Sequence, residues 1–151
     1  MREFRFRLKK MLELREYAEK QKSLVLAEIT GRYLKKEAEI AGLAALRKTF
    51  LTTRFKNADN DSMSLKYDEI QISAINHKIL ALKEELGRIG KEKEDARLEY
   101  IDALKEKKVL EKLQIRKESE YRKEQKARES RTVDDLALTN IAANREVSRW
   151  D

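Results

Sequence analysis

The chain has 151 residues, no proline, no cysteine and only four glycines, and 42% of its residues are charged. Proline breaks helix interiors, so its absence favours long uninterrupted helices. The charged fraction is well above the roughly 25% of ordinary domains, so we expect burial along a thin seam instead of a thick core. No apolar run is long enough to span a membrane, and the charged start MREFRFRLKK lacks the apolar core of a secretory signal. These features predict a soluble, cytoplasmic all-α protein.

The first predicted element is one helix over residues 3–56. Its expected apolar face consists of Phe4, Leu8, Met11, Ala18, Val25, Ile29, Ile40, Leu43 and Phe50. Arg15 and Lys22 fall between them, where long basic side chains can lay their methylene stems along a seam. Between Ile29 and Tyr33 the spacing predicts a register shift of one residue.

Residues 57–64, NADNDSMS, are predicted to form a turn, because Asn, Asp and Ser favour turns and helix N-caps. Asp61 or Ser62 is the expected N-cap of the next helix. A short turn between two long helices predicts an antiparallel hairpin in which paired residue numbers sum to about 121. The expected pairs are Met11 with Leu110, Ala18 with Ala103, Val25 with Ala96, and Leu43 with Ile79.

The second predicted helix, 65–131, contains a seam with steps of three and four residues. The seam consists of Ile72, Ile75, Ile79, Leu82, Leu86, Ile89, Lys93, Ala96, Tyr100, Ala103, Lys107 and Leu110. A 3.5-residue period held this long is typical of a left-handed coiled coil, whereas a helix of a globular bundle has a wider apolar face. We therefore expect a single elongated domain, residues 1–151, in which two long helices form an antiparallel coiled-coil hairpin and the second extends beyond the first.

The seam becomes polar after Leu110, and the second helix is expected to lack an intramolecular partner from about Ser119. Apolar residues return in the tail, 132–151, after Thr132, which is predicted to form a capping box with Asp135. This tail is either a frayed terminus or a helix that becomes ordered on docking. Trp150, the only tryptophan, has no assigned role.

Basic charge is concentrated at one end of the expected hairpin. Residues 1–10 carry five basic side chains and one acid, a net charge of +4. Residues 105–131 carry 11 basic and 6 acidic side chains, a net charge of +5. The hairpin brings these two segments together, and such a basic end is steered toward acidic surfaces.

The sequence offers little for catalysis. His77 is the only histidine and has no cysteine beside it, whereas zinc sites need three or four ligands. Gly87 and Gly90 lie within a predicted helix and lack the Lys-Ser/Thr ending of a phosphate-binding loop. We therefore expect no cofactor, no metal and no enzymatic activity. Basic and acidic residues alternate without an aromatic stacking surface, so nucleic-acid binding is not expected and stays only a second alternative.

Three segments resemble the flagellar export protein family FliJ: FRFRLKKMLELRE at the start, ALKEKKVLEKLQIRKESEYRKE in the second helix, and VDDLA near the end. The resemblance implies a cytoplasmic component at the flagellar base on the inner membrane, part of the type III protein export apparatus and similar to the central stalk of rotary ATPases. It implies that the open end of the hairpin inserts into the export ATPase ring. It also implies contact with the export gate membrane protein and escort of export chaperones, without membrane insertion.

The leading interpretation is thus a non-enzymatic stalk protein of flagellum biogenesis, monomeric when isolated. The residues expected to bind the ATPase are Arg5, Arg7, Lys9, Lys10, Arg15, Lys107, Lys108, Arg128, Arg131 and Leu136. Tyr33 and His77, both expected to be exposed, are the candidates for the export-gate contact. The first alternative is a structural coiled-coil adaptor or scaffold that associates with itself.

Overall fold

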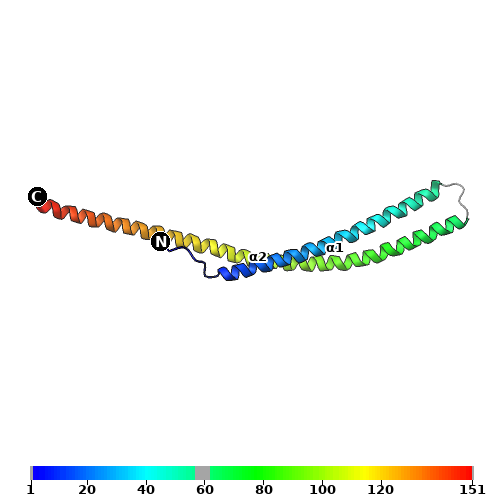
Figure 1. Cartoon of the computed structure of the whole chain (residues 1–151), viewed down its shortest axis with the longest axis horizontal. Helices are drawn as coiled ribbons and strands as arrows, with labels where there is room; N and C mark the ends of the chain where they lie inside the picture. Colours follow the sequence, from blue (N-terminus) through cyan, green and yellow to red (C-terminus); the bar gives the residue numbers. More distant parts are fainter. Residues whose placement is uncertain (1, 57–61, 151) are drawn as a thin grey trace. The chain divides into compact units, whose positions relative to one another are not determined.

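The computed structural model describes residues 2–56 and 62–150, apart from the side chains of Phe55 and Lys56. These residues form two helices and no strand: α1, Lys9–Lys56, and the longer α2, Ser62–Trp150 (Figure 1). The prediction of an all-α antiparallel pair with a longer second helix is confirmed. Most of the expected turn lies outside the described residues, as does the proposed N-cap Asp61. Ser62 is already the first residue of α2, three residues before the predicted start.

The chain forms two packed units. One consists of Tyr17–Leu104, and the other of Met1–Glu16 with Lys105–Asp151. Each contains part of both helices, and in each the contacts between them are antiparallel. In the Tyr17–Leu104 unit, Lys22 contacts Glu99 and Arg54 contacts Glu69. In the second unit Arg15 contacts Glu106. The residue numbers of these three pairs sum to 121, 123 and 121, which agrees with the predicted register.

The predicted seam of α2 is confirmed at every position. All twelve residues from Ile72 to Leu110 are half-buried or buried, and Ile75, Ile79 and Ala96 are the most buried residues of α2. Their neighbours Leu80 and Leu98 are apolar but exposed. Burial therefore follows the 3.5-residue period and not hydrophobicity alone, as expected for coiled-coil pairing.

The predicted seam of α1 is wrong at Met11 and Val25, which are 47% and 45% exposed. Leu12 and Leu26, one residue further along, lie in the seam instead. The seam positions of α1 are Leu12, Arg15, Glu19, Ser23, Leu26, Ile29, Tyr33, Lys36, Ile40, Leu43, Arg47, Phe50 and Arg54. From Leu26 onward their steps alternate regularly between three and four, so the expected register shift does not occur.

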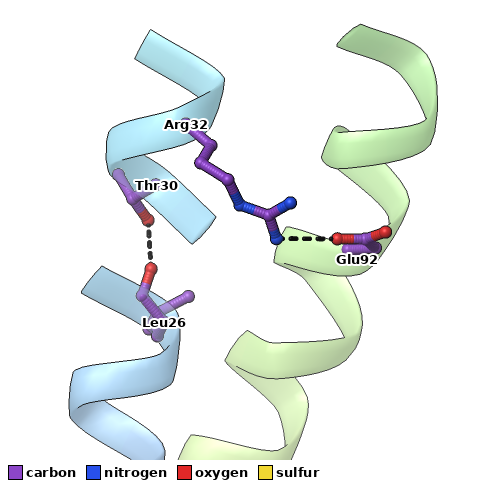
Figure 2. A network of polar contacts seen from close by, with 4 residues as sticks. All are labelled: Leu26, Thr30, Arg32 and Glu92. Atoms are coloured by element: carbon purple, nitrogen blue, oxygen red, sulfur yellow. Dashed lines mark hydrogen bonds and ion pairs between the residues drawn. The ribbon is translucent and has the colours of Figure 1, made fainter. Parts of the chain in front are cut away.

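Charged pairs flank the seam of the Tyr17–Leu104 unit. Arg32 on α1 reaches across to Glu92 on α2 at 3.0 Å (Figure 2). Figure 2 also shows how a threonine is accommodated inside α1: the Thr30 hydroxyl donates a 2.7 Å hydrogen bond to the Leu26 carbonyl. This internal bond satisfies the hydroxyl without a partner from α2.

The predicted start of the first helix, residue 3, is also wrong, because α1 begins at Lys9. Phe4, Phe6 and Leu8 are half-buried, while Arg5 and Arg7 are exposed. In residues 2–6 this two-residue alternation is typical of a non-helical, extended segment, and residues 7 and 8 then form a turn in which the Lys9 amide donates to the Phe6 carbonyl, 3.2 Å away. We call residues 2–8 the N-terminal strap. A helix would place Phe6 on the face opposite Phe4 and Leu8, whereas here all three side chains are half-buried.

The tail, 132–151, was left open between a helix and a frayed end. Its described part is helical, since α2 continues without interruption to Trp150. The predicted capping box at Thr132 is wrong: the Thr132 hydroxyl donates to the Arg128 carbonyl, 2.9 Å away, inside the helix. This bond to the preceding turn satisfies the hydroxyl, so the helix passes through Thr132.

Candidate partner-binding surface

The N-terminal strap packs against α2 within its own unit. The rings of Phe4 and Tyr121 lie 5.5 Å apart between centroids and are tilted by 47°. The Tyr121 hydroxyl donates a hydrogen bond to the Arg2 carbonyl. Tyr121 therefore holds the strap through both its ring and its hydroxyl. The strap covers α2 beyond the N-terminal end of α1, and Figure 1 shows it beside α2 there.

A groove of about 380 Å³ lies between the strap and α2. Its apolar surface comes from Phe4, Phe6, Leu8 and Leu113, and its polar lining residues are Arg5, Arg7 and Lys117. Each of these polar residues is a cation, and no carboxylate lines the groove. The unit therefore combines an apolar recess with positive charge.

All ten residues predicted to bind the ATPase belong to this unit, but their surroundings differ. Arg15 is half-buried against Glu106, Lys107 lies 3.9 Å from Glu111, and Arg128 lies 2.8 Å from Glu124. The other six cations have no carboxylate partner among the described residues: Arg5, Arg7, Lys9, Lys10, Lys108 and Arg131. These six are exposed and are the cations best placed to meet an acidic partner.

The remaining predicted residue, Leu136, lies on the part of α2 that no other described segment covers. Gln125 is the last half-buried residue, and every described residue after it is exposed. We call residues 126–150 the α2 extension. Leu136 is 59% exposed, and its exposed large apolar neighbours on the extension are Val133, Leu138, Ile141, Val147 and Trp150.

Most of the exposed apolar residues of the extension do not continue the seam of α2, and Leu138 is the exception among those named. Continuing the steps of three and four from Leu110 reaches Arg128, Arg131, Asp135, Leu138, Ala142, Arg145 and Arg149, most of which are charged. A different series with the same period contains Val133, Leu136, Asn140, Ala143, Val147 and Trp150. This series starts a new register, so the extension has an apolar stripe of its own.

The two export-gate candidates do not form a common site. Tyr33 was expected to be exposed, but it is half-buried in the α1 seam, because its ring packs under Lys93. The Lys93 ammonium lies 4.7 Å from the ring centroid, a cation–π geometry. His77 is exposed and lies 16 residues before Lys93 on α2, about 24 Å along the helix at 1.5 Å per residue.

The pKa shifts of the described residues belong to ion pairs outside this surface. A hydrogen bond to Glu85, with the charges of Glu39 and Glu85, raises the pKa of Lys36. A hydrogen bond from Arg97 lowers the pKa of Glu94, and the same bond raises the pKa of Arg97. Because all three groups are partners in ion pairs on the helix surface, these pKa shifts indicate pairing and not an acid–base site.

The described residues contain no group of three or more His, Cys, Asp or Glu arranged to hold a metal ion. None of the described helical segments is long and apolar enough to cross a membrane.

The sequence interpretation missed the groove, because it treated residues 3–8 as helix. A signal was available: FRFRL alternates apolar and basic residues with a period of two, which is typical of an extended segment. It also missed the second apolar series on the extension, from which it had selected only Leu136.

The fold and this surface define a class of protein in which two antiparallel helices present a basic, partly apolar surface near the chain ends. The family of the flagellar FliJ protein matches residues 4–146, and the chain belongs to that family. It is accordingly a component of the flagellar export apparatus. No curated protein and no solved structure matches the chain.

Proposed function

We propose that this chain is a non-enzymatic stalk and coupling component of the export apparatus that inserts its α2 extension into the export ATPase ring. One observation carries this proposal: α2 continues for 25 residues beyond Gln125 as a helix whose described side chains are all exposed. A helix with an uncovered apolar stripe is stabilised when a partner buries that stripe. The lumen of a ring would surround a single helix and so could bury this stripe.

The chemistry of the contact follows from the two kinds of side chain on this unit. The unpaired cations, Lys108 and Arg131 among them, would meet acidic or polar loops of the ring. Leu136 and the other members of its stripe would supply apolar anchoring. Exposed charges contribute mainly to the association rate and the orientation, whereas buried apolar groups contribute mainly to affinity.

The remaining roles belong to the same proposal. The chain would act in the cytoplasm at the flagellar base, link the ring to the export gate membrane protein, and escort export chaperones. The gate contact would lie on the Tyr17–Leu104 unit. Exposed His77 would contribute to it, together with the part of the Tyr33 ring that the seam leaves exposed.

The proposal predicts that a hexameric export ATPase co-purifies with the chain and that its ATP hydrolysis rises when the chain is added. Reversal of Lys107 and Lys108 to Glu should abolish this stimulation while the helical circular dichroism signal is retained. Lys107 lies partly in the seam, so the pair Lys108→Glu and Arg131→Glu tests charge without disturbing packing. The matched control is Lys83→Glu with Lys91→Glu, two exposed cations of the other unit.

Full stimulation by the Lys108 and Arg131 double variant would contradict a role for this basic surface. An equal loss in the Lys83 and Lys91 control would show that net charge alone matters, and would contradict the assignment to this unit.

A structural adaptor that associates with itself is the second candidate, favoured by the exposed apolar stripe, since such a stripe can also pair with a second copy. This function predicts a concentration-dependent oligomer in sedimentation, weakened by Leu136→Asp. A sedimentation coefficient that stays monomeric across the concentration range would exclude the adaptor and agree with a monomeric stalk.

A further inference from the structure

The N-terminal strap has three properties that together describe a binding site. Its first part, residues 2–6, is irregular and non-helical, it forms one wall of an apolar groove, and its exposed cations Arg5 and Arg7 have no carboxylate partner among the described residues. α1 begins at Lys9, and its first turn uses only the Phe6 and Leu8 carbonyls of the strap. Residues 7 and 8 form the turn that leads into α1, while residues 2–5 take part in no turn and do not join the two helices.

The backbone of the strap is largely free to bind a partner. Apart from the helix ladders, the backbone bonds near it run from the Lys9 amide to the Phe6 carbonyl, 3.2 Å, and from the Leu12 amide to the Leu8 carbonyl, 2.9 Å. Tyr121 uses the Arg2 carbonyl. Among the described residues, no amide of residues 3–8 donates a hydrogen bond. Water can satisfy these groups, and so can a second extended chain.

The side chains of the strap specify what such a chain would carry. In a paired extended segment, residues opposite one another lie on the same side. The outward row of the strap is Glu3, Arg5 and Arg7, so carboxylates of the partner would form ion pairs opposite the two arginines and not opposite Glu3. Residues opposite Phe4 and Phe6 would point toward α2, where the groove accepts apolar side chains.

We infer that the N-terminal strap and its groove bind an extended peptide segment of a partner protein in which acidic and large apolar residues alternate. A two-stranded pair alone is marginally stable in water, so the apolar anchor and the two ion pairs must supply much of the affinity. Binding therefore requires the alternation. In any other order, some carboxylates would face the apolar groove or some apolar side chains would face outward.

This inference is independent of the stalk proposal, since neither a ring nor nucleotide takes part in the binding. The probe is a fluorescein-labelled peptide, Glu-Leu-Glu-Phe-Glu-Leu, titrated with the full chain while fluorescence anisotropy is measured. The control peptide, Glu-Glu-Glu-Leu-Phe-Leu, has the same composition and charge without alternation. We expect binding of the alternating peptide and about tenfold weaker binding of the control, or less.

Two variants localise the binding. Arg5→Glu with Arg7→Glu should weaken it by about tenfold or more, and Phe6→Ala by about tenfold. The matched control is Lys105→Glu with Lys112→Glu, which makes the same charge change at exposed positions outside the groove and should weaken binding by less than about threefold. Because the strap is not helical, the helical circular dichroism signal should not change in the strap variants.

Equal binding of the two peptides, or an equal loss in the Lys105 and Lys112 control, would overturn the inference and indicate attraction between net charges. Hydrogen exchange gives a second readout. The alternating peptide should slow exchange of the amides of residues 3–8, which are unprotected in the free chain. Binding without this slowing would show that the peptide does not pair with the strap, and would also overturn the inference.

Discussion

Polar side chains occupy many seam positions of α1, and they explain where the sequence interpretation failed. Arg15, Lys36 and Arg54 are half-buried there, with their charged groups directed to Glu106, Glu85 and Glu69 of α2. Long side chains can cover a seam with their methylene stems while their ends stay in water. The sequence interpretation admitted Arg15 and Lys22 to the seam but set the register from apolar residues alone, and so it placed Met11 and Val25 there instead of Leu12 and Leu26.

The corrected register of α1 predicts that substitution of Leu12 destabilises the fold, whereas substitution of the adjacent Met11 hardly changes its stability. Leu12 is 6% exposed, so Leu12→Ala should lower the free energy of unfolding by about 2–3 kcal/mol through lost burial. Met11 is 47% exposed, and Met11→Ala should change it by less than about 0.5 kcal/mol. Chemical denaturation followed by circular dichroism measures both. A larger decrease in the free energy of unfolding for Met11→Ala than for Leu12→Ala would support the register expected from sequence instead.

Lys36 predicts a dependence of stability on pH. Its pKa is raised, mainly by the hydrogen bond to Glu85 and by the charges of Glu39 and Glu85. A raised pKa means that the folded chain holds this proton more tightly, so the stabilisation is complete below the ordinary lysine pKa and disappears as pH rises through the raised value.

The difference in unfolding free energy between the native chain and Lys36→Gln should therefore be larger at neutral than at strongly alkaline pH. Lys35→Gln, an exposed neighbour, controls for other groups that titrate in this range. If, after correction by this control, the difference in unfolding free energy is the same at both pH values, protonation of Lys36 does not stabilise the fold.

At the scale of elements, the two helices are complementary in charge. The ion pairs described between them take the cation from α1 and the carboxylate from α2: Arg15–Glu106, Lys22–Glu99, Arg32–Glu92, Lys36–Glu85 and Arg54–Glu69. Exposed pairs of this kind contribute about 0–1 kcal/mol each, so they select the partner and the register more than they stabilise the fold. They also use part of the positive charge of α1.

The strap is a separate element and should detach without unfolding the helices. Tyr121→Ala removes both the ring contact with Phe4 and the hydrogen bond to the Arg2 carbonyl. Cleavage by trypsin after Arg5 and Arg7 should then become about threefold faster or more, because local opening governs proteolysis. Tyr17→Ala, which removes an exposed tyrosine elsewhere, is the control. Unchanged cleavage in Tyr121→Ala would show that Tyr121 does not hold the strap.

At the scale of the whole molecule, features repeated along the sequence were predictable and single features were not. The absence of proline and the repeated spacing from Ile72 to Leu110 predicted two helices, their antiparallel pairing and the α2 seam. The strap depends on five residues, FRFRL, and on Tyr121, which lies far away in sequence. No repeated pattern in the sequence therefore indicates it. The helical continuation through Thr132 failed to be predicted because an N-cap residue is also tolerated within a helix when its hydroxyl bonds to the preceding turn.

The same distinction applies to the binding surface. Net charge along the sequence was enough to predict that residues 1–10 and 105–131 form a basic region. Which of its cations remain unpaired depends on side-chain geometry, since Glu106, Glu111 and Glu124 engage Arg15, Lys107 and Arg128. The sequence alone does not show which glutamate pairs with which cation.

The central claim is that the α2 extension enters the export ATPase ring, and site-specific photo-cross-linking tests it most directly. A photoreactive residue would replace Leu136, and in a separate variant Leu80, whose exposure of 60% matches the 59% of Leu136 but which lies on the other unit. With the assembled ATPase ring present, the account predicts a cross-link from position 136 to residues lining the ring lumen and none from position 80. Cross-links of equal yield from both positions, or from position 80 alone, would contradict it.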